Sequence, residues 1–200
     1  METHATFPFT ADSKIDWRVA GMAGFKLEKG LVQVYTGNGK GKTTAALGLA
    51  LRAVGRELMV CMIQFVKGGH PCGEHMAAER LAPFFTIVQM GHHGWLGRRS
   101  PGPEAEQMAR QAFRMAREAA CGGRYDLVIL DEINSAVSHG LVSVEELLAL
   151  IRDKGERVEL VLTGRNAAPE IIEAADLVTE MQEAKHYYKA GVKARIGIEK

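Results

Sequence analysis

The segment from Thr36 to Thr44 constrains this chain more than any other part of its sequence. It reads Thr-Gly-Asn-Gly-Lys-Gly-Lys-Thr-Thr and lies between an apolar run, residues 31–35, and a helix-forming run that begins at Ala45. Strand, glycine-rich turn and helix in this order are the context that a phosphate-binding P-loop requires. The glycines let the backbone aim its N–H groups at an anion, and the helix start adds its positive dipole end. We therefore predict that the chain binds a nucleoside triphosphate.

Two residues of this loop have specific expected roles. Lys42 places a point charge on the phosphates, and Thr43 offers a hydroxyl to Mg²⁺. The chain departs from the general pattern at Thr36, where the first glycine is usual, and it carries an additional Lys40 inside the loop. We assign the nucleotide site to Gly37, Asn38, Gly39, Lys40, Gly41, Lys42, Thr43 and Thr44.

Size and composition favour one α/β domain. The chain has 200 residues with Lys+Arg 25 against Asp+Glu 24, a net charge of +1. This near-balance argues against a protein whose main role is to bind a nucleic-acid backbone. Cys61, Cys72 and Cys121 lie far apart and form no Cys-x-x-Cys pair, which is typical of reduced thiols. No secretory signal and no apolar stretch of about 20 residues is present. We predict a cytoplasmic protein with neither nucleic acid nor membrane as a partner.

Apolar runs alternate with helical patterns beyond residue 28. Several runs are continuous, as expected of strands buried on both faces of a parallel sheet. The predicted strands are residues 31–35, 58–65, 84–90, 125–130, 158–162 and 176–181. The predicted helices are residues 43–54, 74–81, 104–120, 144–152 and 169–175, with a Ser143–Glu146 capping box and Pro169 in a first turn. With the P-loop, this order predicts a three-layer P-loop NTPase domain of the RecA-like type with a mostly parallel central sheet.

The N-terminal residues have no sustained periodicity. Phe7, Phe9, Trp17 and Phe25 are scattered among polar residues. We divide the chain into an N-terminal arm, residues 1–28, and a P-loop domain, residues 29–200. The arm either lays its aromatic side chains on a surface or forms a partly disordered tail.

Two acids end the strand predicted at residues 125–130. Asp131 and Glu132 follow a run of apolar residues, and ligands gather at the carboxyl ends of parallel strands. Carboxylate oxygens are hard ligands that suit Mg²⁺. Such a pair can also be a helix cap or a solvated turn. Together with the P-loop, we predict that Thr43, Glu132 and Asp131 hold a divalent cation.

Two further loops are expected at the same edge of the sheet. Lys67 and Glu74 flank the glycine-rich turn after the strand predicted at residues 58–65, and a solvated turn is the plain alternative. His92, His93 and Trp95 follow the strand predicted at residues 84–90. Adjacent histidines do not easily share one metal ion, so we do not assign a metal to them. Trp95 can stack over a planar ligand or pack beneath its loop.

These segments together resemble the P-loop ATP:corrinoid adenosyltransferase family. The resemblance rests on the P-loop and on residues 64–68, 73–74, 130–132 and 163–165, which include Arg165. Its most specific part is the C-terminal segment, Lys185-His186 with residues 190–199. The resemblance covers roughly residues 30–199 in order, so it does not depend on one motif.

The resemblance implies transfer of the 5′-deoxyadenosyl group from ATP to the Co(I) of cobalamin or cobyrinic acid a,c-diamide, with release of triphosphate. Co(I) is itself a strong nucleophile, which agrees with the lack of a recognisable Ser, Cys or His triad. ATP is then the co-substrate and Mg²⁺ or Mn²⁺ the metal. The resemblance also implies a homodimer and a flavoprotein electron donor that reduces Co(II). We hypothesise that the two departures from the general pattern, at Thr36 and Lys40, place ATP so that its C5′ can be attacked.

The corrinoid side of the predicted site is less regular. The family usually has a Gly-Phe-x-Trp segment after its third strand, whereas residues 90–95 keep the glycine and tryptophan without the phenylalanine. An apolar wall that displaces the lower axial ligand would ease reduction of Co(II). We assign corrinoid binding to Trp95, His93, Lys67 and Glu74. Whether the substrate is complete or incomplete is left open.

Two other functions are compatible with the motifs. A P-loop kinase would carry arginines on a mobile lid, for which Arg98 and Arg99 are candidates, and it would release ADP. A RecA-like ATPase that moves a protein or nucleic acid would need a basic stripe or an arginine finger. The net charge of +1 offers this second alternative no support.

Overall fold

A sheet of six parallel strands is the centre of the computed structural model, which describes residues 26–66, 68–69, 72–91 and 102–199. The strand order is β3-β2-β4-β5-β1-β6, and every recorded pairing is parallel. The strands are β1 (Val32–Thr36), β2 (Val60–Gln64), β3 (Phe85–Gln89), β4 (Leu127–Asp131), β5 (Glu159–Thr163) and β6 (Leu177–Glu180). All carboxyl ends therefore lie along one edge.

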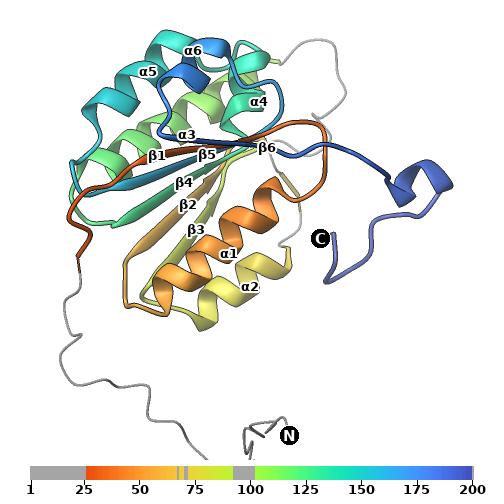
Figure 1. The fold of residues 1–200 in the computed structure, drawn as a ribbon, viewed down its shortest axis with the longest axis horizontal. Helices are drawn as coiled ribbons and strands as arrows, with labels where there is room; N and C mark the ends of the chain where they lie inside the picture. Colours follow the sequence, from red (N-terminus) through yellow and green to blue (C-terminus); the bar gives the residue numbers. More distant parts are fainter. Residues whose placement is uncertain (1–25, 67, 70–71, 92–101, 200) are drawn as a thin grey trace, which may run out of the picture.

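Two layers of helices cover the sheet (Figure 1). Helices α1 and α2 lie on one face, and α3, α4, α5 and α6 lie on the other. The helices are α1 (Lys42–Val54), α2 (Gly73–Arg80), α3 (Pro103–Cys121), α4 (Ile133–Ser138), α5 (Val144–Asp153) and α6 (Pro169–Glu173), followed by the 3₁₀ helix η1 (Tyr187–Ala190). The three-layer α/β fold predicted from the sequence is confirmed.

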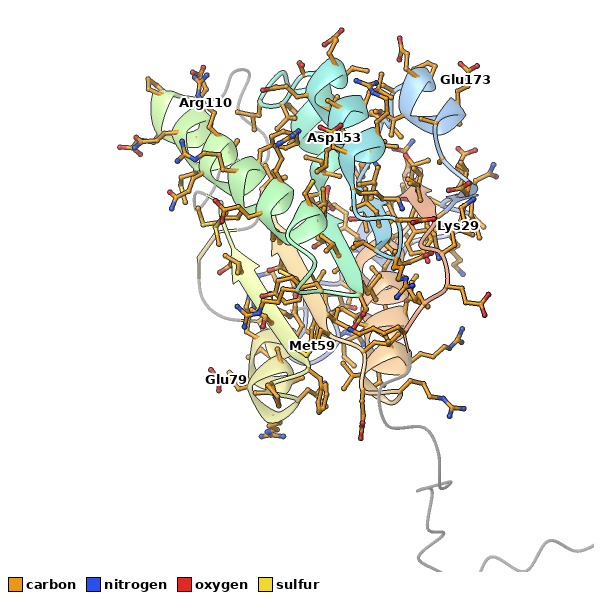
Figure 2. The ribbon with its side chains drawn as sticks, turned by 90° about the vertical axis from the view of Figure 1, so that its left-hand side faces the viewer. Lys29, Met59, Glu79, Arg110, Asp153 and Glu173 are labelled. Carbon is orange, nitrogen blue, oxygen red and sulfur yellow. The ribbon has the colours of Figure 1, made fainter. Side chains whose placement is uncertain are left out.

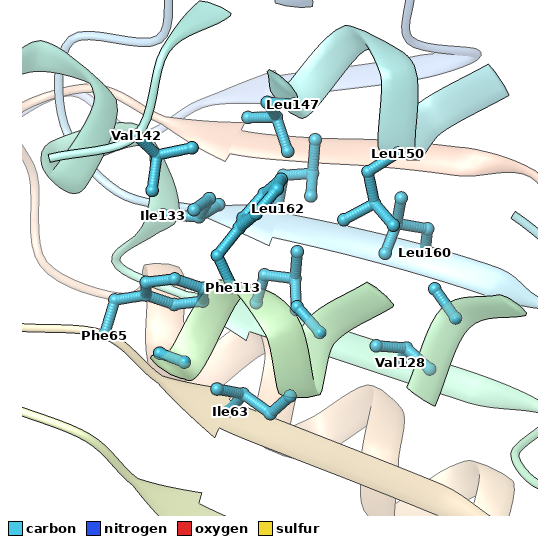
Figure 3. Packing of buried hydrophobic residues seen from close by; sticks show 14 of the residues in the cluster. Ile63, Phe65, Phe113, Val128, Ile133, Val142, Leu147, Leu150, Leu160 and Leu162 are labelled. Atoms are coloured by element: carbon cyan, nitrogen blue, oxygen red, sulfur yellow. The ribbon is translucent and has the colours of Figure 1, made fainter. Parts of the chain in front are cut away.

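Alternate residues of the central strands pack into two separate cores. In β4, Leu127 and Ile129 face α1 and α2, whereas Val128 and Leu130 face α3 and α5. Figure 3 shows the second of these cores, in which Phe113 of α3 lies against strand residues such as Leu162. Because both faces are buried, apolar residues occupy every position of these strands, which explains the continuous runs in the sequence.

Local signals in the sequence fix several helix ends. Ser143 Oγ accepts a hydrogen bond from the backbone N–H of Glu146 at 3.1 Å. The Glu146 carboxylate accepts one from Ser143 N–H at 2.9 Å, so the predicted capping box is confirmed. Pro103 and Pro169 each stand in the first turn of a helix, where no intrahelical N–H donor is needed.

The structure contains all six predicted strands and all five predicted helices. It also contains α4 and η1, which we did not predict. Helix α4 begins directly after Glu132, which has a positive φ of 63° and separates it from β4. A six-residue helix of mixed polarity is too short to produce a recognisable period.

The boundary of the N-terminal arm falls at the edge of the described residues. Residues 1–25, and with them Phe7, Phe9, Trp17 and Phe25, lie outside the described part. At its start, the Lys26 ammonium forms a 2.8 Å ion pair with Asp126, the residue just before β4. The division at residue 28 stays a prediction.

Charged side chains cover the outer faces of the helices (Figure 2). Arg110 and Asp153 mark α3 and α5 on one side of the sheet, and Glu79 marks α2 on the other. Within the described ranges, no helix combines the length and apolar character needed to cross a membrane.

The two cores predict a clear difference between two leucine substitutions. Leu160 is a fully buried residue of β5. Leu160→Ala should lower the free energy of unfolding by about 2–5 kcal/mol because it leaves a cavity. Leu51→Ala, at a position of α1 that is 62% exposed, should change it by less than about 0.5 kcal/mol. Urea denaturation measures both, and equal losses would contradict the core described here.

Candidate functional site

The loop between β1 and α1 has the conformation of an anion-binding turn. Gly37 and Gly41 have φ values of 92° and 126°, which residues with a Cβ rarely adopt. Gly41 is the N-cap of α1, so the unpaired N–H groups of the first helical turn face the loop. This geometry suits a phosphate group.

A chain segment after β6 explains the additional glycines. The backbone N–H of Gly39 donates to the carbonyl of Met181 at 2.6 Å. A Cβ on Gly39 would lie 2.7 Å from that oxygen, and one on Gly37 would lie 2.5 Å from it. Residues larger than glycine would therefore push the loop away from its support. Thr36 contributes a different contact, since its Oγ1 accepts from Ala167 N–H at 3.3 Å.

Lys42 folds back onto its own loop. Its Nζ donates to the carbonyl oxygens of Gly37 at 2.7 Å and Gly39 at 2.8 Å, and the residue is buried. Burial lowers the pKa of the Lys42 ammonium, and the nearby carboxylate of Glu132 opposes that shift. The charged group is thus held at the mouth of the loop, where phosphate oxygens can replace the carbonyls.

Asp131 lies at the end of β4, beside the loop. Its carboxylate is fully buried, and Oδ1 accepts from Thr43 Oγ1 at 2.9 Å and from Thr163 Oγ1 at 2.7 Å. Its Oδ2 accepts a weaker contact from Gln64 Nε2 at 3.4 Å. The sequence predicted this proximity to the P-loop from strand direction alone, and the contact with Thr43 confirms it.

Glu132 points elsewhere although it is the next residue. Its left-handed φ turns the chain, so that its backbone N–H donates to Thr163 Oγ1 at 2.9 Å. Its Oε2 accepts from Ser135 Oγ at 2.5 Å, and the side chain lines the cleft above the loop. The two predicted acids therefore have different surroundings. Asp131 holds the loop threonine, and Glu132 faces the cleft.

Lys42, Thr43 and Glu132 border a cleft of about 500 Å³. The loop and the start of α1 form one side, and Glu74 of α2 contributes to the border. Arg165 lines the cleft as well, and its backbone N–H donates to Ser135 Oγ at 3.2 Å. The cations Lys40, Lys42 and Arg165 thus share the cleft with the carboxylates of Glu74, Glu132 and Glu199.

The C-terminal segment closes another side of the cleft. It leaves the sheet after β6 and extends beyond it (Figure 1), and His186, Ile198 and Glu199 line the cleft. The Glu199 carboxylate accepts from the Tyr187 hydroxyl and pairs with Arg195 at 2.9 Å. The Arg195 guanidinium also lies 5.2 Å from the centre of the Tyr187 ring. The sequence marked this segment through the family resemblance, but it did not predict this contact.

The predicted corrinoid residues are only partly described. Lys67, His93 and Trp95 lie outside the described residues, so their assignments stay predictions. Glu74 does lie on the cleft, where its Oε1 accepts from Gln64 Nε2 at 3.3 Å. Gln64 itself was not predicted, because nothing distinguishes a polar residue at the end of an apolar strand from an ordinary strand end.

A second group of possible metal ligands lies at the start of α2. Cys72, Glu74 and His75 offer ligand atoms within 4.8 Å of one another. However, the Nδ1 atom of His75 already accepts from the Cys72 backbone N–H at 3.0 Å. This arrangement caps the helix, and we assign no metal to it.

A P-loop beside a buried aspartate, at the carboxyl ends of parallel strands, defines a P-loop nucleotide-binding protein. The model of one family, ATP:corrinoid adenosyltransferase BtuR/CobO/CobP, matches residues 28–199. The chain belongs to this family.

Individual relatives agree with this assignment. A corrinoid adenosyltransferase of Pseudomonas aeruginosa is 37% identical over 172 residues, which cover 86% of this chain and 84% of the relative. That of Escherichia coli K12 is 36% identical, with 93% and 92% covered. Corrinoid adenosyltransferase CobA of Salmonella typhimurium is 34% identical over the same shares.

A solved structure supports the fold. The flagellar accessory protein FlaH of Methanocaldococcus jannaschii superposes with a TM-score of 0.54 at 14% identity, covering 80% of this chain and 74% of FlaH. At this identity the likeness shows a shared fold.

Removal of the loop ammonium should weaken nucleotide binding. Lys42→Met should raise the Kd for a fluorescent ATP analogue at least about tenfold, because a charge-assisted contact to phosphate is lost. Lys29→Met makes the same charge change at an exposed position before β1 and should leave the Kd unchanged. Equal Kd values for both variants would contradict the role of the loop.

The contact between Arg195 and Glu199 should persist to low pH. Hydrogen bonds from Arg195 and Tyr187 lower the pKa of Glu199 to about 2, below its ordinary value of 4.5. The carboxylate therefore stays charged above pH 4.5, and the contact is lost as the pH falls towards 2. Carbon NMR of labelled glutamate should report this low midpoint, and Arg195→Gln should raise it. A midpoint near 4.5 in the unaltered protein would contradict the contact.

Proposed function

We propose that this protein transfers the 5′-deoxyadenosyl group of ATP to the Co(I) of a corrinoid and releases triphosphate. The observation that carries the proposal is the P-loop cleft in a chain whose residues 28–199 match the ATP:corrinoid adenosyltransferase family. Residues from the loop, from the ends of β4 and β5 and from the C-terminal segment meet there. These residues support the proposal that ATP binds in the cleft.

The proposed reaction is a nucleophilic displacement at carbon. The electron pair of Co(I) forms a bond to the ribose C5′. The C5′–O bond breaks, and triphosphate leaves with the electron pair of that C5′–O bond. Cobalt ends formally as Co(III). Since the nucleophile belongs to the substrate, the protein has two tasks: to align cobalt with C5′ and to stabilise charge on the leaving group.

The residues of the loop suit the second task, which is to stabilise charge on the leaving triphosphate. The N–H groups at the start of α1, together with Lys40 and Lys42, face the cleft and would bind the triphosphate oxygens. Arg165 would add a third cation from the loop after β5. We assign ATP binding to Gly37, Asn38, Gly39, Lys40, Gly41, Lys42, Thr43 and Thr44.

A divalent cation fits the oxygen groups beside the loop. The Thr43 hydroxyl donates a hydrogen bond to Asp131, which leaves the lone pairs of the Thr43 oxygen available to a cation, and the Glu132 carboxylate faces the cleft. Hard oxygen donors of this kind suit Mg²⁺ or Mn²⁺. When bound, the cation would neutralise charge on the phosphates. Thr43 and Glu132 would hold it, with Asp131 close by as the support of Thr43.

The corrinoid would approach from the loops that follow β2 and β3. We assign its binding to Lys67, Glu74, His93 and Trp95, of which Glu74 lies on the described border of the cleft. An apolar wall at Trp95 would displace the lower axial ligand of Co(II) and ease its reduction by a flavoprotein donor.

The assembly proposed for the protein is a homodimer. Strand β6 is exposed along its whole length, with Leu177 and Val178 more than 40% exposed, and it forms one edge of the sheet. Exposed edge strands are commonly covered by another chain or element. The N-terminal arm, residues 1–28, would close over an active site, either its own or its partner's. The sparse, widely spaced Cys61, Cys72 and Cys121, read as reduced thiols, support a cytoplasmic location.

The reaction predicts two products in equal amounts. Anaerobic protein with Mg²⁺, ATP and chemically reduced cob(I)alamin should yield a light-sensitive alkylcobalamin, followed by its visible spectrum, and one triphosphate for each. Lys42→Met should slow both together, whereas Lys29→Met should not. Release of ADP without a spectral change would overturn the proposal and favour a kinase. ATP turnover that depends on DNA and ignores corrinoids would favour a RecA-like motor.

A further inference from the structure

Thr163 occupies the point where the key groups of the site meet. It is the last residue of β5, which lies between β4 and β1 in the sheet, and it is fully buried. Its register partner in β1 is Tyr35, one residue before Thr36. The sequence analysis included it only as part of the segment 163–165, with no role of its own.

A single hydroxyl of Thr163 serves both acids. Its Oγ1 donates to Asp131 Oδ1 at 2.7 Å and accepts from the Glu132 backbone N–H at 2.9 Å. A hydroxyl has one proton and two lone pairs, so this one group can make both bonds at once. No apolar side chain of the same shape can replace either bond.

The first bond acts on Thr43. Asp131 Oδ1 accepts from Thr163 and from Thr43, and these two donors hold the carboxylate between the loop and β5. With Thr163 absent, the buried carboxylate would lose a donor and could rotate away from Thr43. The direction of the Thr43 lone pairs therefore depends on Thr163.

The second bond acts on Glu132. This residue has a φ of 63° and a ψ of 20°, a left-handed conformation that is unfavourable for a residue with a Cβ. The bond from its N–H to Thr163 helps to fix this turn. Ser135 then holds the carboxylate through its own hydroxyl. Glu132 is thus held at both its backbone and its side chain.

We propose that Thr163 is a positioning residue that sets Thr43 and Glu132 for a divalent cation bound together with ATP. The inference rests on the proposed function, because it takes these two residues as the metal ligands. Thr163 is not expected to contact the cation or the nucleotide. It acts through Asp131 and through the backbone of Glu132.

The test measures how Mg²⁺ supports binding of a fluorescent ATP analogue. Thr163→Val should raise the Mg²⁺ concentration needed for half-maximal binding at least about tenfold, the usual effect of losing a group behind the metal ligands. Its affinity for the analogue in EDTA should change less than about threefold, because the loop N–H groups and Lys42 remain. Thr163→Ser keeps the hydroxyl and should restore the Mg²⁺ requirement of the unaltered protein.

The controls separate this inference from the proposed function. Thr86→Val makes the same change at the second residue of β3 and should leave the Mg²⁺ requirement unaltered. If binding to the unaltered protein does not depend on Mg²⁺, the proposed metal site is wrong. If binding does depend on Mg²⁺, two results would show that Thr163 is not a positioning residue. Either Thr163→Val leaves the Mg²⁺ requirement unchanged, or Thr163→Ser raises it as much as Thr163→Val does. If Thr163→Val does not fold, as judged by its melting curve, Thr163→Ala compared with Thr163→Ser decides the same question.

Discussion

The site depends on the hydrogen bonds that the buried carboxylate of Asp131 accepts. A charge that is fully removed from water is unfavourable unless hydrogen-bond donors surround it. Its donors come from three places: Thr43 at the start of α1, Thr163 at the end of β5 and Gln64 at the end of β2. All three elements must therefore be in place for the carboxylate to be satisfied. The parallel sheet makes this possible because it brings all its carboxyl ends to one edge.

Around this centre the cleft is built from segments that lie far apart in the sequence. The P-loop rests on the chain after β6, through the Gly39–Met181 hydrogen bond, and the same chain continues into the C-terminal segment. Glu199, at the far end of this segment, lines the cleft next to the loop. The P-loop and the C-terminal segment thus share a support, which links the nucleotide site to the end of the chain.

The sequence predicted those features that have a local signal. Apolar runs, several of them continuous, predicted six strands. A glycine-rich turn predicted the loop, and the place of Asp131 and Glu132 followed from strand direction. The sequence could not reveal that the adjacent acids have different surroundings, because Glu132 has a positive φ and its backbone N–H donates to Thr163 of another strand. Thr163 entered only as part of the segment 163–165, without a role of its own, and Ser135 gave no signal, since a threonine in a strand or a serine in a short helix is ordinary. The contact of Glu199 with Tyr187 likewise depends on a turn that no periodicity marks.

The most direct test of the account is a crystal structure with Mg²⁺ and a non-hydrolysable ATP analogue. We expect the triphosphate to lie against the N–H groups of the loop. Lys42 should have turned from the carbonyls of Gly37 and Gly39 to the phosphates. The cation should be bound by Thr43 and Glu132. The ribose C5′ should also face the open side of the cleft, where a corrinoid can approach. A nucleotide bound elsewhere, or one whose C5′ is turned away from the open side, would contradict the central claim.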